Sequence, residues 1–92
     1  MKLEELYKVI TKRSLEKPDG SYVNTLIENG IDRMAQKVGE EAVEVVIAAK
    51  NTNKQRIISE SADLLFHLLV LLQQSGITLE DIYSELGNRS KK

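Results

Sequence analysis

The chain of 92 residues contains no cysteine, only one histidine and only one proline. Without cysteine it can form neither a disulfide framework nor a thiolate metal site, which agrees with a reducing cytoplasm. A nucleophilic triad cannot be assembled either, because cysteine and a Gly-x-Ser-x-Gly elbow are both absent. The sequence also has no Walker loop for nucleotide phosphates. Its chemistry must therefore come from other residue types.

Long apolar runs and a strong charge imbalance are missing as well. No uninterrupted apolar run is longer than Leu68 to Leu72, which is far shorter than the roughly 20 residues that a membrane helix needs. Charged residues at positions 4, 5 and 8 interrupt any signal-peptide core. The net charge of −1 gives no general attraction for nucleic acid or for an anionic membrane. We expect a cytoplasmic protein with no nucleic-acid or membrane partner.

Helical spacing of apolar residues predicts an all-α fold of four to five helices, in a single domain spanning residues 1–92. The predicted elements are a helix ending before Pro18, a turn at 18–20, a short helix at 21–29 capped by Ser21, long helices from Asp32 to about Lys50 and from about Lys54 to Ser75, and a last short helix that Thr78 and Asp81 open with a capping box. Residues 88–92 are expected to fray.

The two long helices should lie antiparallel. The first has a predicted apolar stripe made of Met34, Val38, Val45, Val46 and Ala49. Gly39 lies inside this helix and indicates either a close approach by a ligand or backbone, or simply a tolerated glycine. The second is apolar nearly all round from position 64 to position 72. Because a small monomer can hardly cover such a helix, we expect a subunit interface in an oligomeric helical bundle.

Acidic residues occur in two pairs with the same spacing. Glu41 and Glu44 lie three residues apart on the first long helix, and Glu60 and Asp63 lie three apart on the second. Residues three apart share a helix face. The intervening segment allows one helix to end and the next to climb back to the same height. Two such helices would bring the four carboxylates together, and a hard divalent cation best relieves their repulsion.

The donor type selects the metal. All-carboxylate donors favour Mg²⁺, with Mn²⁺ as the alternative, whereas zinc sites need histidine or cysteine. A di-iron site requires Glu three residues before His, but Leu64 precedes His67 at that spacing. Two roles remain open for His67, a satisfied buried histidine or a group that orients a carboxylate. Because Asp63 lies between Ala62 and Leu64, we expect it to be buried and in need of a partner.

Mg²⁺ held by acids with open positions usually serves phosphate chemistry, in which a spare carboxylate takes the proton of the attacking water. The candidates for binding phosphates are Arg33, Lys37, Lys50 and Arg56. For each cation alone, a solvated surface role is the competing interpretation, and the same holds for the glutamates.

Two segments resemble the phosphoribosyl-ATP pyrophosphohydrolases of histidine biosynthesis. They are Lys37-Val-Gly-Glu-Glu-Ala42 with its continuation to Lys50, and Glu60 to Leu72. The upstream residues Ser21, Tyr22 and 26–30 match as well, so the resemblance covers nearly the whole chain. The acid pairs alone are shared with the wider MazG-like superfamily of all-α nucleoside triphosphate pyrophosphohydrolases. Val23 and Phe66 depart from the family pattern, where threonine and tyrosine are expected.

The resemblance implies Mg²⁺-dependent hydrolysis of phosphoribosyl-ATP to phosphoribosyl-AMP and pyrophosphate, the second step of histidine biosynthesis, by a homodimer or higher homo-oligomer. By position, Glu41, Glu44, Glu60 and Asp63 would bind the metal. Glu40 would be a further ligand or the base, and the candidate catalytic residues are Glu40 and Glu41. Ser21 and Tyr22 would lie near the substrate, and Lys37 would contact phosphate.

Two alternatives compete with this hypothesis. One is a MazG-type enzyme that cleaves ordinary nucleoside triphosphates with the same metal chemistry. The other is a non-enzymatic helical dimerisation module in which the acids only face solvent.

Overall fold

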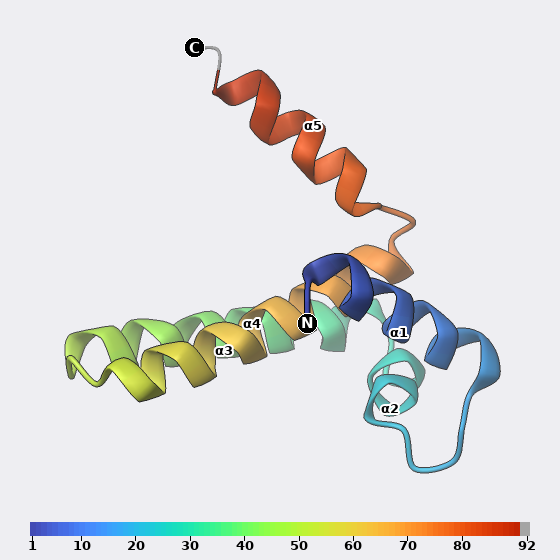
Figure 1. Ribbon diagram of the computed structural model, residues 1–92. Coiled ribbons are helices and arrows are strands. Elements are labelled where there is room, and N and C mark those ends of the chain that lie inside the picture. Colours follow the sequence, from blue (N-terminus) through green and yellow to red (C-terminus); the bar gives the residue numbers. More distant parts are fainter. Residues whose placement is uncertain (91–92) are drawn as a thin grey trace.

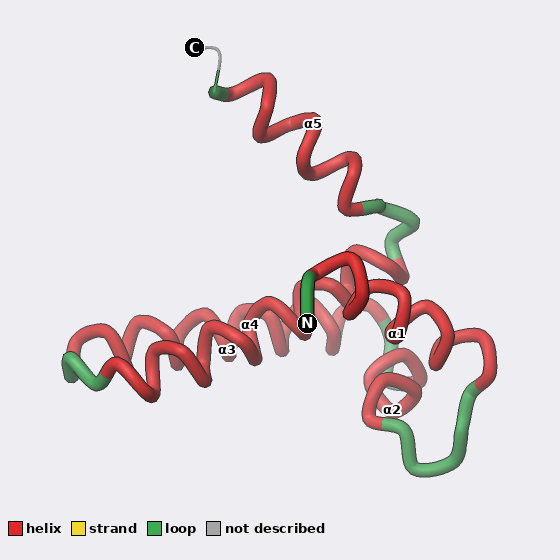
Figure 2. Tube along the Cα trace, viewed as in Figure 1, coloured by secondary structure: helices red, strands yellow, loops and turns green. Residues whose placement is uncertain are grey.

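A computed structural model describes residues 1–90, and within that range the chain is entirely helical apart from its connections (Figures 1 and 2). The five helices are α1 (Leu3–Glu16), α2 (Tyr22–Glu28), α3 (Ile31–Lys50), α4 (Lys54–Gln74) and α5 (Leu79–Arg89). The predicted all-α class with two long helices is therefore confirmed.

The dominant feature is the hairpin formed by α3 and α4, which pack side by side along much of their length (Figure 1). The turn between them occupies residues 51–53, as predicted from the sequence. Thr52 adopts a left-handed φ of 55°, which reverses the chain. Asn53 then caps α4, because its side-chain oxygen accepts a hydrogen bond of 3.1 Å from the backbone N–H of Arg56.

Capping residues fix the ends of the short helices. Ser21 caps α2 by accepting from the backbone N–H of Asn24 at 3.4 Å. Thr78 and Asp81 form the predicted capping box of α5, each accepting from the other's backbone N–H at 3.1 and 2.9 Å. The start of α3 differs by one residue from the prediction, because Gly30 is its N-cap with a φ of 91° and Ile31 begins the helix.

The hydrophobic core lies at the end of the molecule where α1 and α2 meet the hairpin. The buried residues that form it come from all five helices and are Ile10, Val23, Leu26, Met34, Leu69, Val70 and Leu79. α1 packs against α4 and α2, and α2 also packs against α3. Within residues 1–90 the far half of the hairpin has no such cover, and several of its large apolar side chains are exposed.

Part of the predicted stripe on α3 is wrong. Val46 is 52% exposed and Ala49 is exposed, whereas Ala48 is buried. At 100° per residue, Ala48 shares its face with Met34, and Glu41 falls between them. Acidic residues thus occupy part of the face turned toward α4. The apolar side chains farther round the helix, such as Val46, are therefore exposed.

Two further expectations are revised. Gly39 is exposed, and a methyl group added there would meet no atom within 4 Å, so no backbone among the described residues 1–90 packs closely against it. Residues 88 and 89 continue α5 instead of fraying. Lys91 and Lys92, the end of the predicted tail, lie outside the described residues.

α5 points away from the other four helices (Figure 1). Leu79 anchors its first turn in the core, whereas Leu86 near its end is 58% exposed. The Tyr83 hydroxyl donates a hydrogen bond of 2.6 Å to Oε1 of Glu4 and so joins α5 to α1. This bond stabilises the ionised carboxylate and lowers the pKa of Glu4, and it raises the pKa of Tyr83.

Replacing Tyr83 with Phe should raise the pKa of Glu4 back toward its ordinary value, since the carboxylate loses its hydrogen-bond donor. The measurement is an NMR pH titration of the Glu4 side-chain carboxyl. Tyr7→Phe is the matched control, because the Tyr7 hydroxyl bonds the backbone oxygen of Ile77 instead. An unchanged Glu4 pKa in Tyr83→Phe would show that α5 does not hold this orientation in solution.

Candidate metal and phosphate site

Three carboxylates from the two long helices converge at the hairpin. Oxygens of Glu41 on α3 and of Glu60 and Asp63 on α4 all lie within 4.8 Å of one another. The helix faces explain why. Ala48, two turns beyond Glu41, is buried, and so is His67, one turn beyond Asp63. The acids therefore project from faces that continue into the packed interior, which directs them toward the neighbouring helix.

Cations stand directly beside these acids. Lys37 Nζ lies 3.4 Å from Glu41 Oε1, one turn along α3. Arg56 reaches Glu60 Oε1 at 3.6 Å and Glu44 Oε2 at 3.8 Å, so it links the two helices. Two like charges 4.8 Å apart repel by about 1 kcal/mol in bulk water and about 3.5 kcal/mol at an effective dielectric constant near 20. The neighbouring cations offset part of that repulsion.

The remaining predicted residues lie around this group. Glu44 pairs with Arg56 and is not one of the three converging carboxylates. Glu40 pairs with Arg33 at 3.4 Å on the exposed surface of α3. Lys50 is exposed at the end of α3. The expectation that Asp63 is buried is wrong, because it and its neighbour Ala62 are exposed: the helices of this chain leave that side of α4 uncovered.

The donor set fits Mg²⁺ in size and chemistry. The ion takes oxygen ligands at about 2.1 Å in octahedral geometry, so adjacent ligand oxygens stand about 3 Å apart and opposite ones about 4 Å apart. The three oxygens, now within 4.8 Å of one another, would reach those spacings through side-chain rotations. The three carboxylates supply hard donors, and the exposure of Asp63 leaves a side open for water and phosphate. Mn²⁺ accepts the same donors.

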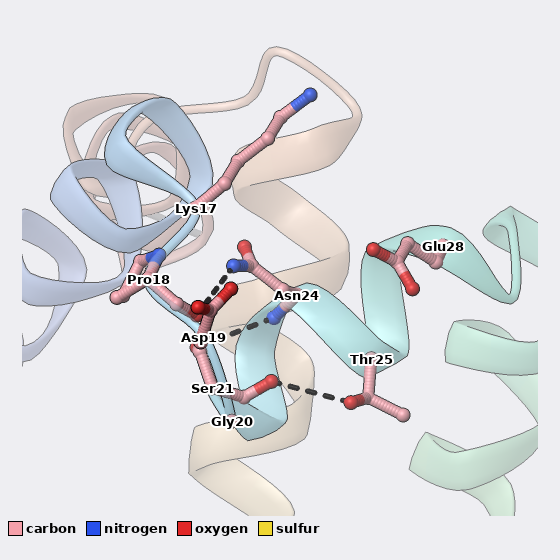
Figure 3. A pocket seen from close by; sticks show the side chains of 8 residues that line it. All are labelled: Lys17, Pro18, Asp19, Gly20, Ser21, Asn24, Thr25 and Glu28. Atoms are coloured by element: carbon pink, nitrogen blue, oxygen red, sulfur yellow. Dashed lines mark hydrogen bonds between the residues drawn. The ribbon is translucent and has the colours of Figure 1, made fainter.

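Ser21 lies at a different place. It lines a polar hollow of about 180 Å³ between α1 and α2 (Figure 3). The hollow is formed by Lys17, Pro18, Asp19, Gly20, Ser21, Asn24, Thr25 and Glu28. None of the clustered acids belongs to this lining. The serine hydroxyl is occupied by the capping bond to Asn24, which accounts for its presence without a ligand.

Tyr22 connects α2 to the helix that carries Asp63. Its hydroxyl lies 2.8 Å from Nε2 of His67, and Nδ1 of His67 lies 2.7 Å from the backbone oxygen of Asp63. The sequence left two roles open for His67, a satisfied buried histidine or a group that orients a carboxylate, and it gave no sign of the contact with Tyr22. The two side chains are 45 positions apart, and no local spacing records how α2 meets α4.

Comparison with known proteins places the chain among enzymes. The model of the family described as phosphoribosyl-ATP pyrophosphohydrolase matches residues 3–90. This chain belongs to that family. The sequence-based recognition and the enzyme class, a phosphoribosyl-ATP diphosphatase of histidine biosynthesis, are thereby confirmed.

Relatives in the family are similar over nearly the whole chain. A phosphoribosyl-ATP pyrophosphatase of Clostridium novyi is 49% identical over 90 residues, which are 98% of this chain and 82% of that protein. One of Saccharolobus solfataricus is 49% identical over 89 residues, 97% of this chain and 95% of that protein. A histidine biosynthesis bifunctional protein HisIE of Caldanaerobacter subterraneus is 53% identical, but the matched region is only 44% of its length.

Removing one carboxylate of the cluster should weaken Mg²⁺ binding at least about tenfold, since even the loss of a group behind a ligand typically costs that much. Glu60→Gln and Asp63→Asn are the variants, and isothermal titration calorimetry with MgCl₂ is the measurement. Glu85→Gln is the matched control, because Glu85 has the same kind of i,i+4 ion pair, with Arg89 on α5. Equal Mg²⁺ affinity in all four proteins would mean that the acids only face solvent.

Proposed function

We propose that this chain hydrolyses phosphoribosyl-ATP to phosphoribosyl-AMP and pyrophosphate with Mg²⁺ held by Glu41, Glu60 and Asp63. The observation that carries the proposal is the convergence of these carboxylates within 4.8 Å, with Lys37 and Arg56 beside them. A site that combines clustered oxygen donors with cations at their edge suits a metal-bound polyphosphate.

Bound Mg²⁺ would neutralise phosphate charge and help to activate a water. The residues of the chain do the rest. Lys37 and Arg56 bind phosphate oxygens once the acids have turned to the metal. Arg33, which is paired with Glu40 in the free chain, and Lys50, exposed at the end of α3, are the candidates for binding the remaining phosphates. In the free chain Glu44 pairs with Arg56 at 3.8 Å. Glu44 joins the metal ligands when Arg56 moves from this ion pair to a phosphate.

The base that takes the proton of the attacking water is Glu40 or Glu41. Glu40 is exposed and outside the group of three, so its carboxylate stays available when the other acids are engaged. Glu41 belongs to the group of three converging carboxylates, so its oxygens are placed to bind the metal. We therefore assign the base role to Glu40 and the ligand role to Glu41.

With Mg²⁺ present, the purified protein should release pyrophosphate from phosphoribosyl-ATP with a kcat/KM at least about a hundredfold above that for ATP, because a site that uses the phosphoribosyl group for binding loses several contacts when that group is missing. A pyrophosphate-release assay on phosphoribosyl-ATP, ATP and a panel of nucleoside triphosphates provides the comparison. Glu60→Gln serves as the inactive control for contaminating phosphatases.

Comparable or better turnover of the panel would instead favour a MazG-type triphosphate pyrophosphohydrolase. No turnover of any of these nucleotides, together with a Mg²⁺ affinity that Glu60→Gln and Asp63→Asn leave unchanged, would favour the dimerisation module.

We further propose that a second copy of the chain covers the outer faces of the hairpin. Val43, Val46 and Ile47 on α3 are 55, 52 and 44% exposed and share one helix face. On α4, Ile58 and Leu65 are 62 and 41% exposed. Helix α4 is long and apolar enough to cross a membrane by those two criteria alone, but core helices of soluble proteins meet them too. Clustered acids on the same helix favour a protein partner in the cytoplasm.

Wild-type protein should sediment as a dimer or larger species, and Val46→Glu should shift it toward the 10.4 kDa monomer, because a buried unpaired charge at a subunit interface costs several kcal/mol. Analytical ultracentrifugation measures both. Leu15→Glu is the control, since Leu15 is 77% exposed on α1. A wild-type protein that stays monomeric at assay concentrations would contradict the proposal.

A further inference from the structure

The contact between Tyr22 and His67 constrains where each proton lies. The backbone oxygen of Asp63 can only accept, so the Nδ1 atom of His67, 2.7 Å away, must be the donor. In the neutral ring, Nε2 then has a lone pair and no hydrogen. The Tyr22 hydroxyl, 2.8 Å from Nε2, is therefore the donor in the second bond.

The ring of Tyr22 is held as well as its hydroxyl. Phe66 stacks beside it with the ring centres 6.1 Å apart and the planes at 23°. His67 meets it edge-on at 5.6 Å. His67 itself is only 6% exposed, whereas Tyr22 is 45% exposed. The Tyr22 side chain is thus held in place while part of it remains exposed. It lies beside His67, one helical turn after Asp63 on α4.

We infer that His67 is a positioning residue that makes the Tyr22 hydroxyl a hydrogen-bond acceptor for the nucleoside part of the substrate. The hydroxyl hydrogen is committed to His67, so Tyr22 has no donor left for a phosphate oxygen, which only accepts. Its free lone pair can take a hydrogen bond from a ribose hydroxyl or a base amino group.

The location agrees with that chemistry. His67 lies one helical turn after Asp63, so Tyr22 lies about 5 to 6 Å farther along α4 than the acid cluster. That distance suits the groups next to a metal-bound phosphate chain. This inference rests on the proposed function, because it takes the acid cluster as the phosphate end of the site.

Tyr22→Phe tests the inference, since it removes the hydroxyl and keeps the ring. We expect the KM for phosphoribosyl-ATP to rise about fivefold, the size of one lost neutral hydrogen bond, with kcat within about twofold of wild type. The Ki for pyrophosphate as product inhibitor should stay unchanged, because pyrophosphate carries no nucleoside. Tyr7→Phe is the matched control, as its hydroxyl bonds a backbone oxygen at a comparable 2.7 Å.

Two outcomes would overturn the inference. An unchanged KM would mean that the Tyr22 hydroxyl serves only to join α2 to α4. A rise in the Ki for pyrophosphate equal to the rise in KM would place Tyr22 on phosphate. A wild-type protein that does not bind Mg²⁺ would instead count against the proposed function and not against this assignment.

A second measurement tests the role of His67 without activity. The side-chain ¹⁵N NMR spectrum of wild-type protein should show a protonated Nδ1 and an unprotonated Nε2 for His67, and Tyr22→Phe should shift the Nε2 signal. For activity, His67→Gln retains an acceptor oxygen and should raise KM less than His67→Leu does. A protonated Nε2, or equal KM values for the two His67 variants with their folds intact, would refute the positioning role.

Discussion

Repulsion among the clustered carboxylates is the constraint on which the site depends. The hairpin of α3 and α4 places three negative side chains within 4.8 Å of one another, and such an arrangement is stable only when positive charge balances it. In the free chain Lys37 and Arg56 provide that charge. Helix packing must supply the free energy that keeps the acids close, and the core at the α1 and α2 end of the molecule is its main source within the chain.

The sequence predicts the scaffold well because each signal is local. Helix periods, the caps at Ser21 and Thr78, and the turn before Asn53 are set by residues a few positions apart. The convergence of the acid pairs follows from two helix spacings and the length of the connection. Glu41, Glu60 and Asp63 therefore come together as the pattern predicts. Glu44 pairs with Arg56 instead, and the choice between these two contacts depends on side-chain rotamers.

The failures concern orientation relative to other elements. Asp63 looks buried from its apolar neighbours Ala62 and Leu64, yet it is exposed because no helix of this chain covers that side of α4. Val46 of α3 looks like core, yet it is 52% exposed and Ala48 takes the packed position. A capping box at Thr78 fixes where α5 begins and says nothing about the direction in which it points. Tyr22 and His67 meet only through the placement of α2, which no local pattern encodes.

The ion pairs of the free chain also explain how the site can accept a highly charged ligand. Each cation near the cluster already lies within 4 Å of a carboxylate, so neither needs to move far to meet a phosphate. Under the proposed function, a divalent cation bound by the acids would free Lys37 and Arg56 to pair with phosphate oxygens. The number of charge pairs would then be conserved, so binding would leave neither of these two cations unpaired. Lys37→Met should accordingly loosen the substrate more than the metal, since the acids keep the ion while the phosphates lose a partner.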